Sequence, residues 1–352
     1  MVKLALIGLG IVAEQLHLPA CESIPEIEVA AACDVDEARA RAVQSRFKIP
    51  AIYTDAAKML TEAQPDIVIV ATPPHTHHAM CVLALQHGAH VLCEKPFMSS
   101  VAEADDVIAQ AKTAGRLLRV NTQYRYMPVY RETQQRLAAG EFGRLFFAQC
   151  WQQMFHPPNM NPTAWRADLK QSALYEFGAH PLDLLCYLFD SFPVAVAAVI
   201  PTQPAYESDV LVHLTLHFPE QRFATLVLNR ISHAPERYLE MRLDCENSSL
   251  RLSYGGLARA GVQMQRYQGS TRPSLRLSYV RGGEARAERG WSSQPYVQER
   301  QFASSQATAE HLRVFLREMG GASLESAFHA REILRLTFAA YDAAQRQTVV
   351  SL

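Results

Sequence analysis

The first 121 residues contain short apolar runs separated by stretches of helical composition. The runs do not alternate polar and apolar residues, which is typical of strands covered on both faces. They lie at residues 3–8, 28–33, 66–71, 90–93 and 117–121. Residues 36–47 and 101–115 have the composition of helices, and the second stretch ends at Gly115, a suitable C-cap. This repetition of strand and helix predicts a doubly wound parallel α/β sheet.

From residue 122 onward the pattern changes to alternation with a period of two residues. Such alternation predicts an antiparallel sheet with one covered face. The alternating runs lie at 209–218, 222–231, 237–245 and 249–254. In the first run, alternation places Leu211, His213, Thr215 and His217 on one side and Val212, Leu214, Leu216 and Phe218 on the other. The half-polar side is compatible with the pairing of two copies of the chain.

The rest of this second region predicts an α+β domain. We expect helices at 128–140, 307–319 and 325–345, a strand at 145–154, and loops across the Gly-, Ser- and Arg-rich stretch 268–305.

Composition supports two domains, which we place at 1–121 and 122–352, because 352 residues exceed one ordinary core. A formal net charge of −1 argues against binding to nucleic acid or to an acidic membrane surface. No apolar run reaches membrane-spanning length, and no basic leader precedes the first strand. The seven cysteines, without a C-x-x-C pair, are typical of buried, reduced thiols. We therefore expect a cytoplasmic protein.

A glycine turn follows the first strand, with the pattern Gly8-x-Gly10-x-x-Ala13. Gly8 permits a tight turn, Gly10 lets the backbone approach a pyrophosphate, and Ala13 allows close packing of helix and strand. Glycines also mark ordinary turns, but here a strand precedes and a helix follows. The context predicts a dinucleotide site.

Asp34 ends the second strand, 24 residues after Gly10, near the interval expected for a carboxylate that binds the adenosine ribose. The alternative role is that of a cap for the helix at 36–47. A carboxylate at this position would repel a 2′-phosphate, so NAD is expected. Arg39 and Arg41 could offset the repulsion, and NADP remains the alternative cofactor.

The stretch 90–100 ends a buried strand with Glu94, Lys95 and Pro96. Ligands of open α/β sheets bind beyond the carboxyl ends of the strands, which would place Lys95 beside the nicotinamide. An exposed Glu94–Lys95 pair is the alternative, and it would contribute little energy. The rigid X-Pro bond disfavours that alternative, because it restrains the preceding lysine.

Several motifs together resemble the Gfo/Idh/MocA family, which includes glucose–fructose oxidoreductase and inositol dehydrogenase. They are GLGIVA, ATPPHTHHAM (71–80), GAHVLCEKPF (88–97), YRYMP (124–128), GEFGRL (140–145), AWR (164–166) and EFGAHPLDLL (176–185). The likeness covers most of the chain. It implies an N-terminal Rossmann domain and a C-terminal α+β domain with a large, mostly antiparallel, open-faced sheet.

The resemblance also implies a catalytic group. His180 would accept the hydroxyl proton of an alcohol, Lys95 would position that hydroxyl, and Glu176 would orient the pair; histidine suits proton transfer near neutral pH. Arg125 and Asp183 would contact substrate, although Asp183 could equally cap a helix. Arg125, Tyr126, Asp168 and Tyr175 are pocket candidates of mixed chemistry.

A larger set is implied to bind the cofactor. It comprises Gly8, Gly10, Ile11, Val12, Asp34, Thr72, Pro73, His75, His78, Glu94, Lys95, Asn121, Trp165 and Arg166. The histidines at 75, 77 and 78 also suggest a metal site, but no further ligand is evident and we expect no metal.

The chain departs from the family pattern at three places. Glu176 stands where aspartate is usual, Pro181 limits His180 to a helix start, and residues 170–175 replace a glycine-rich stretch. A regular i,i+4 pair of Glu176 and His180 is therefore not predicted.

The expected function is hydride transfer between NAD(P) and a secondary alcohol or carbonyl of a sugar, sugar derivative or cyclitol. An NAD-dependent glycosidase of the same family and a non-enzymatic dinucleotide-binding regulator are the alternatives. A homodimer or homotetramer joined through the C-terminal sheet is expected.

Overall fold

A computed structural model gives the fold and describes residues 1–158, 164–167, 169–233, 237–255, 259–267, 270–278, 282–299 and 304–352. The chain divides into two compact units that are discontinuous in sequence. The first unit comprises 1–127, 174–184 and 304–342, and the second comprises 128–173, 185–303 and 343–352. We expected a single boundary after residue 121, whereas the first unit also includes segments from the later part of the chain.

The first unit is built on a parallel sheet with the strand order β3-β2-β1-β4-β5-β6. Its strands are β1 (Val2–Ile7), β2 (Ile27–Cys33), β3 (Ala51–Tyr53), β4 (Ile67–Val70), β5 (His90–Cys93) and β6 (Leu118–Val120). The predicted doubly wound sheet is thus confirmed, whereas β3, a short strand whose residues are all only half-buried, was not predicted. The order reverses between β1 and β4, where ligand sites form in such sheets.

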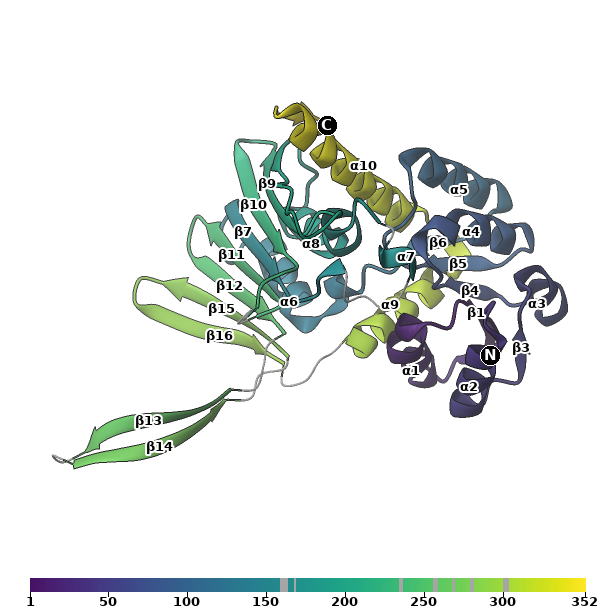
Figure 1. Cartoon of the computed structure of the whole chain (residues 1–352), viewed down its shortest axis with the longest axis horizontal. Coiled ribbons are helices and arrows are strands. Elements are labelled where there is room, and N and C mark those ends of the chain that lie inside the picture. Colours follow the sequence, from purple (N-terminus) through teal and green to yellow (C-terminus); the bar gives the residue numbers. More distant parts are fainter. Residues whose placement is uncertain are drawn as a thin grey trace. The chain divides into compact units, whose positions relative to one another are not determined.

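Helices cover both faces of this sheet (Figure 1). They are α1 (Leu18–Glu22), α2 (Glu37–Phe47), α3 (Ala56–Ala63), α4 (His77–Gln86), α5 (Val101–Ala114), α9 (Ser304–Glu318) and the first part of α10 (Glu325–Arg346). One face packs against α3, α4, α5 and α10, and the other against α1, α2 and α9. The late helices at 307–319 and 325–345 were predicted, but not their place in the first unit.

The second unit is built on a mostly antiparallel sheet with the order β16-β15-β12-β11-β7-β10-β9-β8-β17. Its strands are β7 (Leu145–Gln153), β8 (Ala195–Val199), β9 (Leu211–Phe218), β10 (Arg222–Asn229), β11 (Leu239–Cys245), β12 (Ser249–Tyr254), β15 (Gly283–Arg289), β16 (Ser292–Gln298) and β17 (Val350–Ser351). Only the β7–β10 pair departs from antiparallel pairing among the described strands of this sheet. The predicted α+β character is confirmed.

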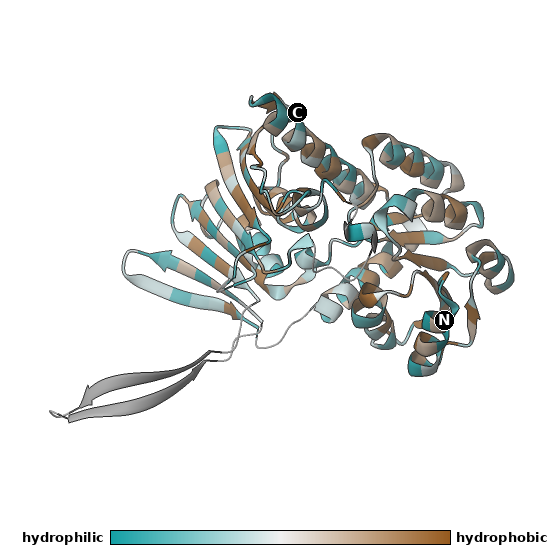
Figure 2. Ribbon diagram, in the orientation of Figure 1, coloured by the Kyte–Doolittle hydropathy of each residue, from teal (hydrophilic) through white to brown (hydrophobic). Residues whose placement is uncertain are grey.

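Alternation along β9 follows the sequence prediction, with Val212, Leu214, Leu216 and Phe218 all buried. Figure 2 shows the corresponding change between hydrophilic and hydrophobic residues along the strands of this sheet. The helix α6 (Pro128–Ala138) contacts β12, β15 and β16. The covered face is therefore the one that carries the apolar residues.

The prediction of loops across 268–305 was wrong. The stretch contains β15 and β16, and a separate pair, β13 (Arg259–Tyr267) and β14 (Ser270–Ser278), forms a hairpin that begins before it. Strands at the edge of a sheet are commonly rich in charged and polar residues, so composition did not reveal them.

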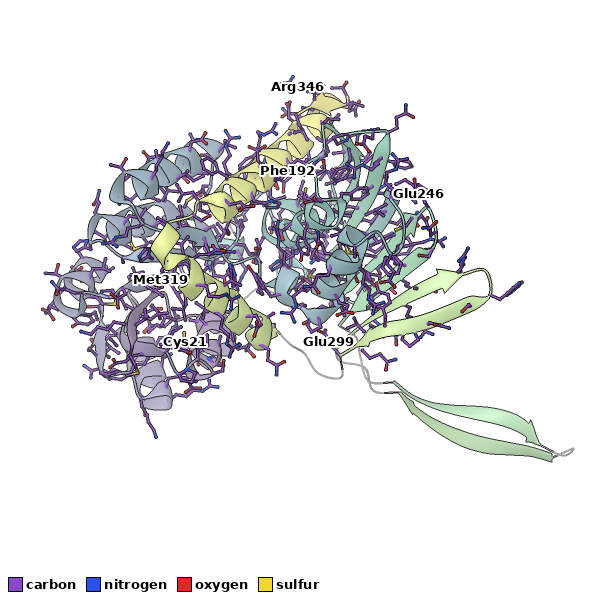
Figure 3. All side chains as sticks on the ribbon, turned by 180° about the vertical axis from the view of Figure 1, so that it is seen from behind. Cys21, Phe192, Glu246, Glu299, Met319 and Arg346 are labelled. Carbon is purple, nitrogen blue, oxygen red and sulfur yellow. The ribbon has the colours of Figure 1, made fainter. Side chains whose placement is uncertain are left out.

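All seven cysteines are buried, as predicted. Cys21, labelled in Figure 3, lies at the end of α1 among the side chains of the first unit. Among the described helices, none combines the length and apolar character needed to cross a membrane.

Candidate functional site

The glycine turn lies where β1 ends. Gly8 has a φ of +92°, and a Cβ there would lie 2.6 Å from the carbonyl oxygen of Ala71, which follows β4. Glycine is therefore required for the close approach of these two strand ends. An added Cβ on Gly10 would meet no atom within 4 Å, so the backbone at Gly10 borders open space. This geometry fits a dinucleotide whose pyrophosphate approaches the turn. Ile11 is exposed and Val12 half-buried on the helical turn that follows.

Asp34 directly follows β2, and its buried carboxylate faces the glycine turn. Its Oδ2 accepts a hydrogen bond from the Leu9 backbone N–H at 2.8 Å, and Oδ1 accepts one from Asp36 N–H at 2.9 Å. The Arg39 guanidinium lies 3.3 Å from Oδ2. The cap of α2 is Asp36, not Asp34, because its side chain accepts the Arg39 N–H. Asp34 is thus fixed beside the glycine turn, and its predicted contact with a ribose stays a prediction.

The segment after β4 directs its histidines away from one another. His77 is fully buried; its Nε2 lies 2.8 Å from the carbonyl oxygen of Thr72, and its Nδ1 lies 2.9 Å from that of Pro96. His78 instead pairs with Asp106 on α5 at 2.7 Å, and His75 is exposed. Among the described residues, no group of three His, Cys, Asp or Glu side chains could hold a metal ion.

Thr72 and Pro73 lie directly after β4 in this half-buried segment. Since His77 joins the Thr72 carbonyl to that of Pro96, it links two turns at the carboxyl edge of the sheet. The predicted cofactor contacts of Thr72, Pro73, His75 and His78 remain predictions.

Glu94, the first residue after β5, is a buried carboxylate with several donors. Its Oε1 accepts hydrogen bonds from His17 Nε2 at 2.8 Å and from Asn121 Nδ2 at 2.6 Å. Its Oε2 accepts the backbone N–H of Lys95 at 3.0 Å. Burial alone raises the pKa of Glu94, but His17, the charge of Lys95 and the Asn121 hydrogen bond outweigh it and lower the pKa to about 2. Glu94 is therefore ionised at neutral pH, and the exposed Glu94–Lys95 pair considered above is excluded.

Lys95, Glu176 and His180 meet in the first unit, although Glu176 is 81 residues from Lys95 in the chain. Lys95 Nζ donates a hydrogen bond to the Glu176 backbone carbonyl at 3.3 Å, and the Lys95–Pro96 peptide is cis. Lys95, His180 and Asp183 line one cavity with apolar residues from α10. Glu176 is buried and is not among the residues that line this cavity.

The local chain around His180 is irregular. A π-helical turn, Ala173–Phe177, carries Glu176, and α8 (Ala179–Phe189) begins two residues after that turn ends. Gly178 joins them. Glycine is required there, because a Cβ would lie 2.4 Å from the carbonyl oxygen of Leu174. Pro181 lies in the first turn of α8, where a missing N–H is tolerated. The predicted helix start at His180 is therefore confirmed.

The environment of His180 keeps its imidazole neutral. The ring is buried and stacks on Tyr124, with centroids 4.0 Å apart and planes 1° from parallel. Burial and the charge of Lys95 lower the pKa of His180 to about 3, against the opposing influence of Glu94 and Asp183. A neutral imidazole at physiological pH is the form that can accept a proton.

Asp183 lies in the first turns of α8 and takes part in a buried ion cluster. Arg125 donates two hydrogen bonds to it, from Nε to Oδ2 at 2.8 Å and from Nη2 to Oδ1 at 2.7 Å. His329 on α10 lies 3.1 Å from the same Oδ1 and also contacts Arg125. Burial raises the pKa of Asp183, but the charge of Arg125 and the contact with His329 lower it well below its usual range. The structure thus joins the two predicted substrate residues.

Other predicted residues lie elsewhere. Asn121 is fully buried, and both atoms of its side-chain amide are bonded within the protein, to Glu94 and His311. Trp165 and Arg166 lie on α7 (Ala164–Ala167) in the second unit, where the guanidinium of Arg166 stacks 4.4 Å from the Trp165 ring. Their predicted contact with the nicotinamide stays a prediction.

The remaining pocket candidates make different contacts. Tyr175 is buried and donates to the Met98 carbonyl at 2.8 Å, whereas Tyr126 stacks on His311. Asp168 lies outside the described residues.

Sequence reasoning missed four residues of this region: His17, Tyr124, His311 and His329. His17 had a local signal, since it is a lone histidine on the apolar helix that follows the glycine turn. His311 and His329 had none, because 190 residues separate His311 from Asn121 and 204 separate His329 from Arg125.

Comparisons with known proteins agree with this geometry. Residues 2–122 match the model of an oxidoreductase family with an NAD-binding Rossmann fold, and residues 130–251 match the GFO/IDH/MocA C-terminal domain. The chain belongs to the Gfo/Idh/MocA oxidoreductase family. The predicted family and its dinucleotide-binding fold are thereby confirmed.

Individual members of the Gfo/Idh/MocA family show the same relationship. An uncharacterised oxidoreductase of Rhizobium meliloti is 30% identical over 65% of this chain and 68% of its own length. A D-apiose dehydrogenase of Paraburkholderia graminis is 32% identical over 61% and 57%, and an inositol 2-dehydrogenase of Acidothermus cellulolyticus is 29% identical over 56% of each chain. With several relatives the match thus spans less than two thirds of their length. The relatives' names agree with the predicted class, a dehydrogenase.

Solved structures share the fold over the whole chain. The aldose–aldose oxidoreductase of Caulobacter crescentus, complexed with glycerol, has a TM-score of 0.81 at 22% identity and covers 100% of this chain and 99% of its own. An Agrobacterium radiobacter oxidoreductase in complex with NAD+ and L-tartaric acid has a TM-score of 0.80 at 18% identity and covers 99% and 98%. At these identities the likeness supports the fold.

Proposed function

We propose that this protein oxidises a secondary alcohol of a sugar, sugar derivative or cyclitol with NAD as hydride acceptor, and catalyses the reverse reduction. The observation that carries the proposal is that Lys95 and His180 line the same cavity, with Glu176 in contact with Lys95. The named relatives, which act on D-apiose and inositol, support this substrate class.

The side chains divide the reaction between them. Lys95 donates a hydrogen bond to the alcohol oxygen and stabilises the negative charge that develops there. Neutral His180 accepts the hydroxyl proton, while the Glu176 backbone carbonyl accepts a hydrogen bond from Lys95 and orients it. When bound, the nicotinamide ring supplies the acceptor for the hydride that leaves the alcohol carbon. The alcohol thus loses a proton to His180 and a hydride from its carbon, and becomes a carbonyl.

We assign the cofactor to the edge formed by the ends of β1, β2 and β4. The open space at Gly10 and the buried carboxylate of Asp34 suit a pyrophosphate and a ribose diol, respectively. Asp34 would repel a 2′-phosphate, which supports NAD over NADP.

The proposal predicts that Lys95→Ala and His180→Ala each lower turnover at least ~100-fold while NADH still binds, since acid–base groups typically contribute that much. Activity would be followed by NADH formation with D-apiose, myo-inositol and a methyl glucoside. Lys112→Ala, an exposed lysine on α5, is the matched control and should be unaffected. Retained activity in both site variants would contradict the assignment.

The same assays separate the alternatives. A glycosidase would cleave the glucoside without net NADH formation and would retain stoichiometric NAD on purification. A regulator would bind NADH without turnover on any member of the panel.

A further inference from the structure

A directional chain of hydrogen bonds ends at Glu94, the residue that precedes Lys95. Arg119 Nε donates to His311 Nε2 at 3.1 Å, and His311 Nδ1 lies 3.1 Å from Asn121 Oδ1. Asn121 Nδ2 then donates to Glu94 Oε1 at 2.6 Å. An arginine only donates and an ionised carboxylate only accepts, so the direction of every bond is determined. His311 is therefore neutral with its proton on Nδ1, in agreement with a pKa that burial and the charge of Arg119 lower.

His17 bonds the same carboxylate oxygen as Asn121. It is fully buried, and its Nε2 lies 2.8 Å from Glu94 Oε1, so that Nε2 must carry the hydrogen. The Lys95 backbone N–H bonds the second oxygen, Oε2. Three parts of the chain thus meet at Glu94: the helix after the glycine turn, the end of β6 and, through Asn121, α9.

We propose that His17 and His311 are positioning residues of the reacting centre: acting on Glu94, they fix a buried negative charge next to Lys95 and keep its side chain charged and in place. The inference rests on the proposed role of Lys95 in the reaction. Neither histidine lines the cavity that contains Lys95 and His180.

The physical link is the reciprocal interaction of two charges. The charge of Lys95 lowers the pKa of Glu94, so the Glu94 anion stabilises the Lys95 ammonium by the same free energy. A buried carboxylate that loses a donor becomes protonated more readily. Loss of His17, or of His311 acting through Asn121, would thus raise the pKa of Glu94 and weaken the support that its anion gives to the Lys95 ammonium. His180, Asp183 and the Glu176 carbonyl, which also lie near Lys95 among the described residues, stay unchanged in such variants.

The test measures Lys95 itself and needs no substrate. The rate at which acetic anhydride acetylates Lys95 would be followed against pH by mass spectrometry, because only the neutral amine reacts. In His17→Leu and His311→Leu the midpoint should move to lower pH by about one unit. His17→Gln and His311→Asn keep a donor at nearly the same place and should restore the wild-type midpoint.

His90→Leu is the matched control. His90 is also buried, at the start of β5, and accepts the Leu117 N–H at 2.9 Å without contact with Glu94. This variant should leave the midpoint unchanged. Glu94→Gln, nearly isosteric with the native residue, should lower it even where a leucine variant does not fold.

An unchanged midpoint in Glu94→Gln and in the leucine variants, or an equal shift in His90→Leu, would overturn the inference. Failure of the proposed function would give a different result. If the variants show the shifts but the wild-type protein oxidises no polyol, the inference about Lys95 is supported and the proposed reaction is contradicted.

Discussion

At the scale of single residues, Asp34 and Arg39 bring opposite charges to the proposed nucleotide end of the site. The Asp34 carboxylate is anchored by two backbone N–H groups, whereas Arg39 reaches it with a side chain that is 46% exposed. An exposed guanidinium held by a carboxylate becomes available to a phosphate when the carboxylate is removed.

We expect Asp34→Ser to shift the ratio of NADPH to NADH affinity at least about tenfold toward NADPH, a change of about 1.4 kcal/mol. Fluorescence titration with both reduced cofactors measures it. Asp36→Ser is the control, because Asp36 caps α2 and serine also caps helices. An equal shift in both variants would mean that Asp34 does not select the cofactor.

At the scale of elements, the ends of the parallel strands border the proposed site. Two glycines of one turn have different roles there. Gly8 lets β1 approach the end of β4, whereas Gly10 leaves room beside the turn. A substitution at each position therefore separates folding from binding.

Gly10→Ala should keep the thermal stability of the protein and weaken NADH binding at least about tenfold, since its methyl group enters the space proposed for the pyrophosphate. Gly8→Ala should instead lower the melting temperature, because its φ is positive and its Cβ would lie 2.6 Å from the Ala71 carbonyl oxygen. Calorimetry and NADH titration give both quantities. Gly320→Ala, also without a neighbour within 4 Å, should change neither.

Glu299, labelled in Figure 3, follows β16 and is a mostly buried acid of the second unit. Burial raises its pKa from 4.5 to about 7, against the backbone N–H of Val129 and the charge of Arg131. The folded protein thus binds this proton more tightly than the unfolded chain does. The stabilisation is present below about pH 4.5 and is lost as the pH rises through about 7.

The melting temperature should therefore fall more steeply between about pH 5 and pH 7 in the wild type than in Glu299→Gln, by a few degrees. Differential scanning calorimetry across that range provides the comparison. Glu220→Gln, at a side chain that is 64% exposed, should behave like the wild type. Parallel curves for the wild type and Glu299→Gln would contradict the role of this carboxyl group.

At the scale of the whole molecule, the open face of the second sheet suggests self-association. Phe147 on β7 and Phe223 on β10 are paired in register with ring centroids 4.6 Å apart, and Trp151 lies on the same face of β7. Trp151 is 43% exposed and Phe223 41%. We propose that this face joins two copies of the chain, as homodimers or within homotetramers, because it exposes an apolar cluster between polar strands.

Light scattering should accordingly give at least twice the mass of one chain, and Trp151→Glu should shift the protein toward the monomer, since a charge would be buried in the interface. Val35→Glu, at a residue 90% exposed in the first unit, is the control. A wild-type protein that is monomeric at working concentration would contradict the proposed self-association.

Much of this protein could be predicted from local patterns. Five of the parallel strands, the glycine turn, Asp34 and the strand that ends at Lys95 all follow from hydrophobic runs and from the residues that bound them. These features depend on neighbours within a few positions. The strands β15 and β16, at one end of the second sheet, could not be predicted in the same way, because their polar composition resembles that of a loop.

The sequence by itself determined the order of the elements and the residues at the strand ends, since periodicity and turn chemistry are local properties. Only the tertiary structure decided which distant groups meet there: His311 with Asn121, His329 with Asp183, and Glu176 with Lys95. The two histidine contacts require the late helices α9 and α10 to pack in the first unit, and the Glu176 contact requires the turn Ala173–Phe177 to do the same. The burial that keeps His180 neutral, and the buried contacts with His17 and Asn121 that keep Glu94 anionic, also depend on the tertiary structure, because a side chain leaves water only when the whole fold surrounds it.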